Sequence, residues 1–317
     1  MSRQLLIFTG NANRPLAEAI CRHLGIPLGR ALVDCYVNGE TRVLLEESVR
    51  GADVFVVQPT CTPVNHHLME MLLMIDALRR ASADRITAGV PYYGYAKQEK
   101  KSRPREPISA KLVAELIEKA GANRVLTCDL HAPAIEGFFD IPVDHLQARM
   151  LLAQYVHGLQ LPDPVIVAPD AGRAGWALEF RDRIGGDLAF ITKHHPGVDR
   201  TEVVDMVGEV QGRTAVLIDD MILTGATLLG GVELLRDRGA REVYVCATHA
   251  ALADGIRARV ESWPVSRVLV TDTVPLHGSP PSDRPSKIAV LSVAPMLAEA
   301  IGRIHDDQSV SALFRHT

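Results

Sequence analysis

The chain lacks several features that would place it in other classes of protein. Its five cysteines are odd in number, scattered and without metal-site spacing, so neither a disulfide framework nor a cysteine-ligated metal is expected. No apolar segment approaches the roughly 20 residues that a membrane-spanning helix needs. The first ten residues form a short apolar run that feeds a turn, which is not the pattern of a signal peptide. These absences predict a cytoplasmic protein that has no membrane partner.

A strong excess of basic residues is also missing. The 34 Lys and Arg are outnumbered by 38 Asp and Glu, giving a formal net charge of −4. A general nucleic-acid binder would be basic, so nucleic acid is not an expected partner, although a local basic cluster occupies residues 97–105. No short-period repeat or low-complexity segment appears. The length of 317 residues exceeds that of a typical domain and favours two domains.

Short apolar runs alternate with amphipathic helical patterns, which is the order of α/β proteins with mostly parallel sheets. Strands are predicted at residues 5–8, 54–58, 86–90, 124–127, 165–168, 188–192, 215–218, 242–247 and 267–271. Helices are predicted at residues 16–24, 67–80, 109–120, 175–184, 228–238 and 252–263. The two halves show the same alternation, as if one fold had been duplicated. We place the domain boundary near residues 147–150.

The most informative stretch of the chain is residues 216–227. An apolar run ends in Asp219 and Asp220, and a turn follows that contains Thr224, Gly225, Ala226 and Thr227. Ligands of open α/β sheets bind at the carboxyl ends of strands, and small residues at a helix start let backbone N–H groups surround a phosphate. Two carboxylates suit sugar hydroxyls, so the stretch predicts a phosphorylated sugar. Taken alone, it is also compatible with an ordinary strand-to-helix turn whose acids are solvated.

Residues 216–227 resemble the 5-phosphoribosyl-1-diphosphate binding motif of phosphoribosyltransferase-like proteins. Further motifs resemble the ribose-phosphate diphosphokinases: PYYGYA at 91–96, REPI at 105–108, DLHAP at 129–133, GFFDIP at 137–142, TDTVP at 271–275 and VLSVAPMLAEAI at 290–301. The resemblance runs from about residue 8 to residue 314. It implies two phosphoribosyltransferase-like domains. Residues 1–148 with 295–317 would form the first domain, and residues 149–294 would form the ribose-5-phosphate-binding domain.

The resemblance implies transfer of diphosphate from ATP to the C1 hydroxyl of ribose 5-phosphate, which yields phosphoribosyl diphosphate and AMP. Ribose 5-phosphate would bind at Asp219, Asp220 and Thr224 to Thr227. The implied cofactor is Mg²⁺, held between His131 and Asp170, although imidazole is a less usual magnesium ligand than carboxylate. Asp170, Ala171 and Gly172 would bind the diphosphate. The resemblance implies ATP-binding roles for Asn38, Glu40, Lys97, Gln98 and Arg103.

Several of these segments depart from the pattern of the resembled family. Lys193 is present on the loop expected to close over the transferring group, but the family's second Arg there is His195. An imidazole titrates near pH ~6.5, whereas a guanidinium stays charged. Arg173 replaces the second of two adjacent glycines, and Leu223 replaces an acid that would face the ribose. Asn38 and Lys97 stand where Asp and Arg are usual, and Lys lacks the planar fork of Arg.

Two alternatives to an active synthetase remain open at this stage. The departures fall within functional segments, which would also fit a catalytically weak or regulatory paralogue, or an enzyme with altered substrate preference. A salvage phosphoribosyltransferase shares the motif at 216–227 but usually has a single such domain and lacks the segments at 92–107 and 129–133. The resemblance also implies a homo-oligomer, a hexamer built from dimers, with the ATP site shared between subunits.

Overall fold

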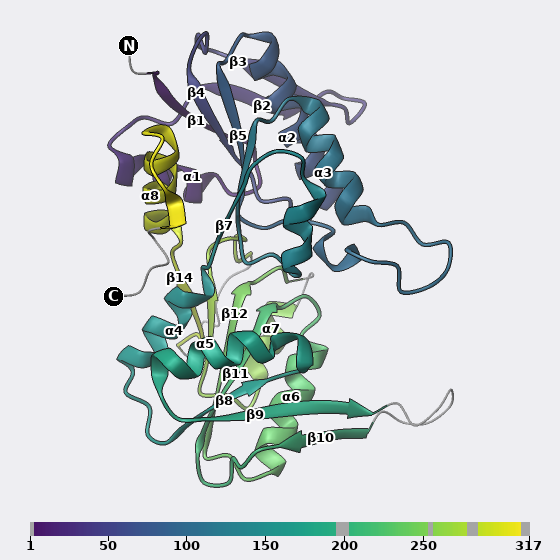
Figure 1. Ribbon diagram of the computed structural model, residues 1–317, viewed down its shortest axis with the longest axis vertical. Helices are drawn as coiled ribbons and strands as arrows, with labels where there is room; N and C mark the ends of the chain where they lie inside the picture. Colours follow the sequence, from purple (N-terminus) through teal and green to yellow (C-terminus); the bar gives the residue numbers. More distant parts are fainter. Residues whose placement is uncertain (1–2, 195–202, 253–255, 278–284, 312–317) are drawn as a thin grey trace. The chain divides into compact units, whose positions relative to one another are not determined.

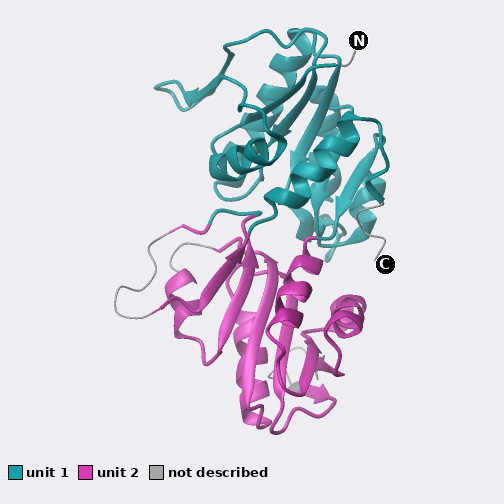
Figure 2. Ribbon diagram, turned by 90° about the vertical axis from the view of Figure 1, so that its left-hand side faces the viewer, with its two compact units in different colours: residues 1–147, 273–275, 292–317 teal, residues 148–272, 276–291 magenta. Residues whose placement is uncertain are grey.

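The computed structural model describes residues 3–194, 203–252, 256–277 and 285–311. It divides into two compact units, coloured separately in Figure 2. Unit 1 comprises residues 1–147, 273–275 and 292–317, and unit 2 comprises residues 148–272 and 276–291. None of the helices within the described ranges has the length and apolar character needed to cross a membrane.

Unit 1 is built around a parallel sheet of five strands in the order β1-β4-β5-β6-β7. The strands are β1 (Leu5–Thr9), β4 (Asp53–Val57), β5 (Arg85–Val90), β6 (Arg124–Cys128) and β7 (Val143–Leu146). The helices are α1 (Arg14–Leu24), α2 (Val64–Arg80), α3 (Ser109–Ala120) and α8 (Ala294–His305). A separate antiparallel hairpin is formed by β2 (Ala31–Cys35) and β3 (Thr41–Leu45).

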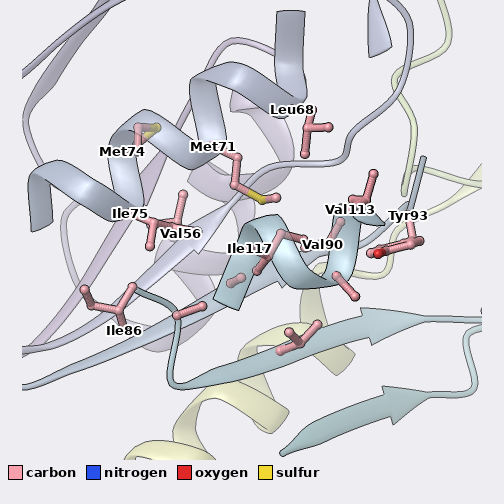
Figure 3. Packing of buried hydrophobic residues seen from close by; sticks show 14 of the residues in the cluster. Val56, Leu68, Met71, Met74, Ile75, Ile86, Val90, Tyr93, Val113 and Ile117 are labelled. Atoms are coloured by element: carbon pink, nitrogen blue, oxygen red, sulfur yellow. The ribbon is translucent and has the colours of Figure 1, made fainter. Parts of the chain in front are cut away.

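One core of unit 1 lies between the sheet and helices α2 and α3. Figure 3 shows Met71, Met74 and Ile75 of α2 beside Val56 of β4 and Ile117 of α3. These side chains are fully or almost fully buried. Their spacing of three to four residues along α2 matches one face of a helix, so the amphipathic pattern explains why this segment packs here.

Helix α8 is attached to unit 1 by a buried charged cluster. Asp53 at the start of β4 has no exposed surface and accepts hydrogen bonds from Nε and Nη2 of Arg85, at 2.8 and 2.6 Å. Nδ1 of His305, the last residue of α8, lies 2.8 Å from Asp53 Oδ2. Arg85 also donates to the carbonyl of Ile304 at 2.7 Å. Two segments more than 200 residues apart in sequence are thereby joined.

Unit 2 contains a sheet of seven strands in the order β10-β9-β8-β11-β12-β13-β14, parallel except at the β9–β10 edge. Its strands are β8 (Pro164–Ala168), β9 (Asp187–His194), β10 (Val203–Val207), β11 (Thr214–Met221), β12 (Glu242–His249), β13 (Arg267–Thr271) and β14 (Ile288–Leu291). Its helices are α4 (Arg149–Gly158), α5 (Ala174–Ile184), α6 (Ala226–Asp237) and α7 (Ile256–Ser262). Figure 1 labels most of these elements.

Helices cover both faces of this sheet. Successive residues of a strand point to opposite faces, so each strand contributes side chains to two cores. Ala215 and Leu217 of β11 belong to the core that includes α6 and α7. Val216 and Ile218 belong to the core that includes α4 and α5. A strand buried on both faces reads as an unbroken apolar run, which is the pattern that predicted β11.

The α/β fold class predicted from the sequence is confirmed, and the strand orders explain the apparent duplication. β1-β4-β5-β6-β7 of unit 1 follows the same plan as β8-β11-β12-β13-β14 of unit 2, with β4 and β11 in equivalent places. Element ends differ by a few residues: β11 continues through Met221, and α6 begins at Ala226, two residues earlier than predicted. The acidic pair therefore belongs to the strand itself.

Candidate functional site

The candidate site of unit 2 lies where three neighbouring parallel strands end. β9, β8 and β11 are adjacent in the sheet and run in the same direction. The segments that follow them, or form their last residues, contain Lys193, Asp170 to Gly172, and Asp219 to Thr227. The fold thus brings sequence-predicted residues from three separate segments to one edge of the sheet. This edge is where open α/β sheets bind ligands.

The segment from Leu223 to Thr227 comprises the turn after β11 and the first residues of α6. Gly225 precedes α6 with φ of 73°, in the left-handed region that glycine adopts readily. Thr224, Ala226 and Thr227 are exposed, whereas Gly225 is buried. The first backbone N–H groups of the 12-residue helix α6 lie at this turn, and the helix dipole favours an anion there.

The acidic pair is buried to different extents. The side chain of Asp219 is 17% exposed and that of Asp220 only 2%. Burial, together with the neighbouring Asp220 carboxylate, raises the pKa of Asp219 to about 7, although Arg173 acts in the opposite direction. Asp219 is therefore the carboxylate of the pair that a ligand can reach. Its ionisation near neutral pH depends on its burial and on the charges of Asp220 and Arg173.

Arg173 contacts both carboxylates. Its Nε lies 3.2 Å from Asp219 Oδ1, and its Nη2 lies 2.8 Å from Asp220 Oδ1. The guanidinium carbon stands 5.1 Å from the ring centre of Trp176 on the first turn of α5. The sequence identified Arg173 only as a departure in the diphosphate turn. Its link to the acidic pair was missed because Arg173 and Asp219 are 46 positions apart and no local pattern connects them.

The expected diphosphate turn is open to ligand. Asp170, Ala171 and Gly172 are exposed, and the last two lie in the short 3₁₀ helix Ala171–Arg173 that leads into α5. A Cβ built on Gly172 would lie 3.1 Å from Asp170 Oδ1, so the glycine leaves room for that carboxylate. The turn therefore presents one carboxylate and exposed backbone at the end of β8.

Only one of the two expected catalytic residues lies within the described part of the chain. Lys193 is the next-to-last residue of β9, paired in register with Val204 of the antiparallel strand β10. His195 lies outside the described residues. The backbone of Lys193 thus belongs to β9, and β8 lies between β9 and β11 in the sheet.

In unit 1, two of the expected ATP-binding residues occupy the tip of the β2–β3 hairpin. Asn38 and Glu40 are both exposed. Asn38 Oδ1 accepts a hydrogen bond from the Glu40 backbone N–H at 3.2 Å, and Gly39 between them has φ of 86°. The side chain of Asn38 therefore stabilises the tip of the hairpin, on which Glu40 is exposed.

The other expected ATP-binding residues follow β5. Lys97, Gln98 and Arg103 are exposed on the basic segment, and Ser109 Oγ donates to Gln98 Oε1 at 2.6 Å. β6 lies beside β5 and leads to the half-buried His131. Glu99 is within electrostatic reach of His131. The basic segment and the expected metal-binding histidine of unit 1 are thus brought to one sheet edge.

The fit of a magnesium ion depends on the donors that each unit offers. His131 belongs to unit 1 and Asp170 to unit 2. Within the described ranges, no three His, Cys, Asp or Glu gather closely enough to hold a metal by themselves. Mg²⁺ usually binds through one or two carboxylates and keeps substrate phosphates and water as its other ligands. The exposed carboxylate of Asp170 fits an ion that arrives with phosphates, rather than one enclosed by protein.

Comparisons with known proteins agree over nearly the whole chain. Residues 5–121 match the N-terminal domain of ribose phosphate pyrophosphokinase, and residues 188–315 match the phosphoribosyl synthetase-associated domain. The ribose-phosphate pyrophosphokinase of Oceanobacillus iheyensis is 48% identical over 98% of this chain and 97% of its own. That of Caldanaerobacter subterraneus is 49% identical over 99% of this chain and 98% of its own.

A solved structure extends this likeness to three dimensions. The crystal structure of phosphoribosylpyrophosphate synthetase from Mycobacterium smegmatis superposes with a TM-score of 0.90 at 44% sequence identity. The match covers 96% of this chain and all of that one. The likeness includes both units, so it is not confined to the loop at 216–227.

Proposed function

Because the chain belongs to the ribose-phosphate pyrophosphokinase family, we propose that it transfers the diphosphoryl group of ATP to ribose 5-phosphate. The products are phosphoribosyl diphosphate and AMP. The observation that carries this proposal is the sheet edge of unit 2, where an exposed helix N-terminus, an acidic pair and an open turn lie together. A salvage phosphoribosyltransferase is disfavoured, because the full-length likeness includes unit 1.

Ribose 5-phosphate is held at the end of β11. The exposed N–H groups at the start of α6 and the hydroxyls of Thr224 and Thr227 receive the phosphate, as an anion prefers a helix N-terminus. Asp219 and Asp220 supply the carboxylates for the ribose hydroxyls, with Asp219 the more accessible. Gly225 and Ala226 present backbone without a bulky side chain, so the phosphate can approach closely.

ATP is bound through the exposed residues of unit 1. Lys97 and Arg103 carry positive charge to its phosphates, and Gln98, Asn38 and Glu40 supply polar groups for the nucleoside. Asp170, Ala171 and Gly172 receive the diphosphate in unit 2. The resemblance assigns Mg²⁺ to His131 and Asp170, and the ion when bound would supply charge neutralisation for the phosphates.

The transfer is a displacement at phosphorus. The C1 hydroxyl oxygen of the ribose attacks the β-phosphorus of ATP, and its proton is released to solvent. The bond between that phosphorus and the bridging oxygen of the α-phosphate breaks, and AMP leaves with the oxygen. Lys193 stabilises the negative charge that spreads over the transferring group. His195 does so only while protonated, because a neutral imidazole carries no positive charge.

The proposal is tested by mixing the purified protein with ribose 5-phosphate, ATP, Mg²⁺ and inorganic phosphate, and following the products by phosphorus NMR. Equal amounts of AMP and phosphoribosyl diphosphate are expected. The second candidate, a catalytically weak or regulatory paralogue, is favoured by the departures from the family pattern at Asn38, Lys97, Arg173, His195 and Leu223, which all fall within functional segments. It would leave ATP intact while ribose 5-phosphate still binds. Nucleotide formation from free bases would instead reveal a phosphoribosyltransferase.

We further propose a homo-oligomer working in the cytoplasm. The reasons are the resemblance to a family of hexamers built from dimers, and the cysteines, none of which is disulfide-bonded. Light scattering during size-exclusion chromatography measures the assembly directly. A monomer at working concentration would contradict the shared ATP site that the resemblance implies.

A further inference from the structure

The cation nearest the acidic pair is built into the fold. Arg173 follows the exposed diphosphate turn, yet its own side chain is only 9% exposed. The guanidinium reaches Asp219 and Asp220 at 3.2 and 2.8 Å, so one cation is shared by two carboxylates. A buried arginine is favourable only when it is paired in this way. The pairing raises the pKa of Arg173 despite its burial, which keeps the guanidinium charged at all relevant pH values.

The position of the guanidinium is supported from its other side. The ring of Trp176 lies 5.1 Å from the Arg173 guanidinium carbon and 4.8 Å from that of Arg149. Arg149 is itself paired with Glu179, from Nε at 2.7 Å and from Nη2 at 3.1 Å. The charge of Arg149 is thereby compensated locally. Arg173, in contrast, contacts both carboxylates of the acidic pair.

Charge balance matters because the proposed ligand is an anion. Two buried carboxylates beside the phosphate-binding turn carry up to two negative charges, and they would repel a sugar phosphate. When both carboxylates are ionised, one arginine in contact with both changes the net charge of the group from −2 to −1. Electrostatic interactions over a few ångströms in a partly buried site are worth about 1.4 kcal/mol or more, equivalent to a factor of about ten in affinity.

The burial of the pair indicates which carboxylate stays with the arginine. Asp220 is 2% exposed and holds the shorter of the two contacts, so a ligand does not reach it without displacing buried side chains. Asp219 is 17% exposed and has the longer contact. The sugar can therefore meet Asp219 while Asp220 and Arg173 remain together.

We propose that Arg173 is a positioning residue that acts as a permanent counter-ion of the acidic pair, so that ribose 5-phosphate binds at Asp219 while Asp220 stays paired with the guanidinium. The inference rests on the proposed function for the identity of the sugar phosphate. It assigns a role to a residue that departs from the glycine of the resembled family. A solution cation is then not needed to neutralise the pair.

The test is binding of ribose 5-phosphate by isothermal titration calorimetry, without ATP, in EDTA and again in Mg²⁺. The wild-type Kd is expected to differ by less than about threefold between the two conditions. Arg173→Gln should raise the Kd about tenfold or more in EDTA, and Mg²⁺ should restore most of the affinity by supplying the missing positive charge. Arg181→Gln is the matched control, because Arg181 lies on α5, the helix that follows Arg173, but pairs with the exposed Asp182.

Arg173→Lys keeps the proposal testable if the glutamine variant folds poorly. Lysine retains the positive charge but lacks the planar, two-pronged guanidinium group. The Kd of the lysine variant in EDTA should therefore stay much closer to that of the wild type. A lysine variant as weak as the glutamine variant would overturn the counter-ion role. So would a glutamine variant that binds as tightly as the wild type in EDTA, since the arginine would then compete with the sugar or be irrelevant. If the wild type itself does not bind ribose 5-phosphate, the proposed function fails together with this inference.

Discussion

Gly225 lies directly against the indole ring of Trp263: a Cβ built on the glycine would stand 2.6 Å from Cζ2 of the ring. Trp263 is 3% exposed and belongs to the core beneath α6 and α7, so it has little freedom to move away. Gly225 also has φ of 73°. Both its conformation and its surroundings therefore exclude a larger residue at the turn that we assign to the phosphate.

Gly225→Ala should weaken ribose 5-phosphate binding. The left-handed conformation costs a non-glycine residue roughly 1–2 kcal/mol, and contact with Trp263 adds to this, so we expect the Kd to rise about tenfold or more. Calorimetric titration measures the change. Gly230→Ala is the control, because Gly230 lies within α6 with open space around it and should leave the Kd unchanged. An unaltered Kd in the Gly225 variant would contradict the assignment of this loop to phosphate.

Asp219→Asn should change how stability depends on pH. An aspartate has an ordinary pKa of 3.8, whereas burial and the nearby Asp220 raise that of Asp219 to about 7. The raised value means that folding favours the neutral form. The stability from this group is full below about pH 4 and is lost as the pH rises through about 7. Asparagine stays neutral at every pH. The free energy of unfolding of the variant, relative to that of the wild type, should therefore rise by a few kcal/mol between about pH 4 and pH 7.

Thermal melting of both proteins at pH values from 4.5 to 8 measures this gap. Asp182→Asn is the control, since Asp182 is exposed on α5 and its substitution should produce no such trend. A Tm difference between wild type and the Asp219 variant that stays constant with pH would argue against the raised pKa.

Lys193→Ala should reduce turnover strongly while leaving ribose 5-phosphate binding nearly intact. The residue belongs to β9, beside the strand that leads to the diphosphate turn, and its assigned role is to stabilise the transferring group. Removal of one such stabilising group from an enzyme costs roughly 10²–10³ in kcat. AMP formation in a coupled assay gives the rate. Lys111→Ala, an exposed lysine of α3 paired with Glu115, should retain the wild-type rate. An unchanged kcat after Lys193→Ala would refute the role.

Asn38→Ala should raise the KM for ATP more than the KM for ribose 5-phosphate. The alanine removes the hydrogen bond from the Glu40 backbone N–H that shapes the hairpin tip, with an expected effect of roughly three- to tenfold. Asn38→Asp is the matched variant, because a carboxylate oxygen can still accept this hydrogen bond. Steady-state kinetics with each substrate varied in turn separates the two effects. Equal changes in both KM values would mean that the hairpin does not serve the nucleotide.

Some features could be predicted from the sequence because they depend on local patterns. The apolar run before Asp219 predicted a buried strand, and the small residues after it predicted a turn into a helix. The order of such segments predicted parallel sheets, because a strand that is followed by a helix must return in the same direction. The ends of the elements were predicted less closely. Hydrogen bonding to β12 extends β11 through Met221, beyond the apolar run that predicted the strand.

Other features were decided only by the tertiary structure. The sequence contained Arg173 as an isolated departure, but only the adjacency of β8 and β11 brings its guanidinium to Asp219 and Asp220. The same holds for Asp53 and His305, which are 252 positions apart and meet because α8 packs beside the sheet of unit 1. Periodicity along a chain reports which face of an element is buried. Which charges become partners depends on the elements that lie side by side, because electrostatic pairing acts through space and not along the chain.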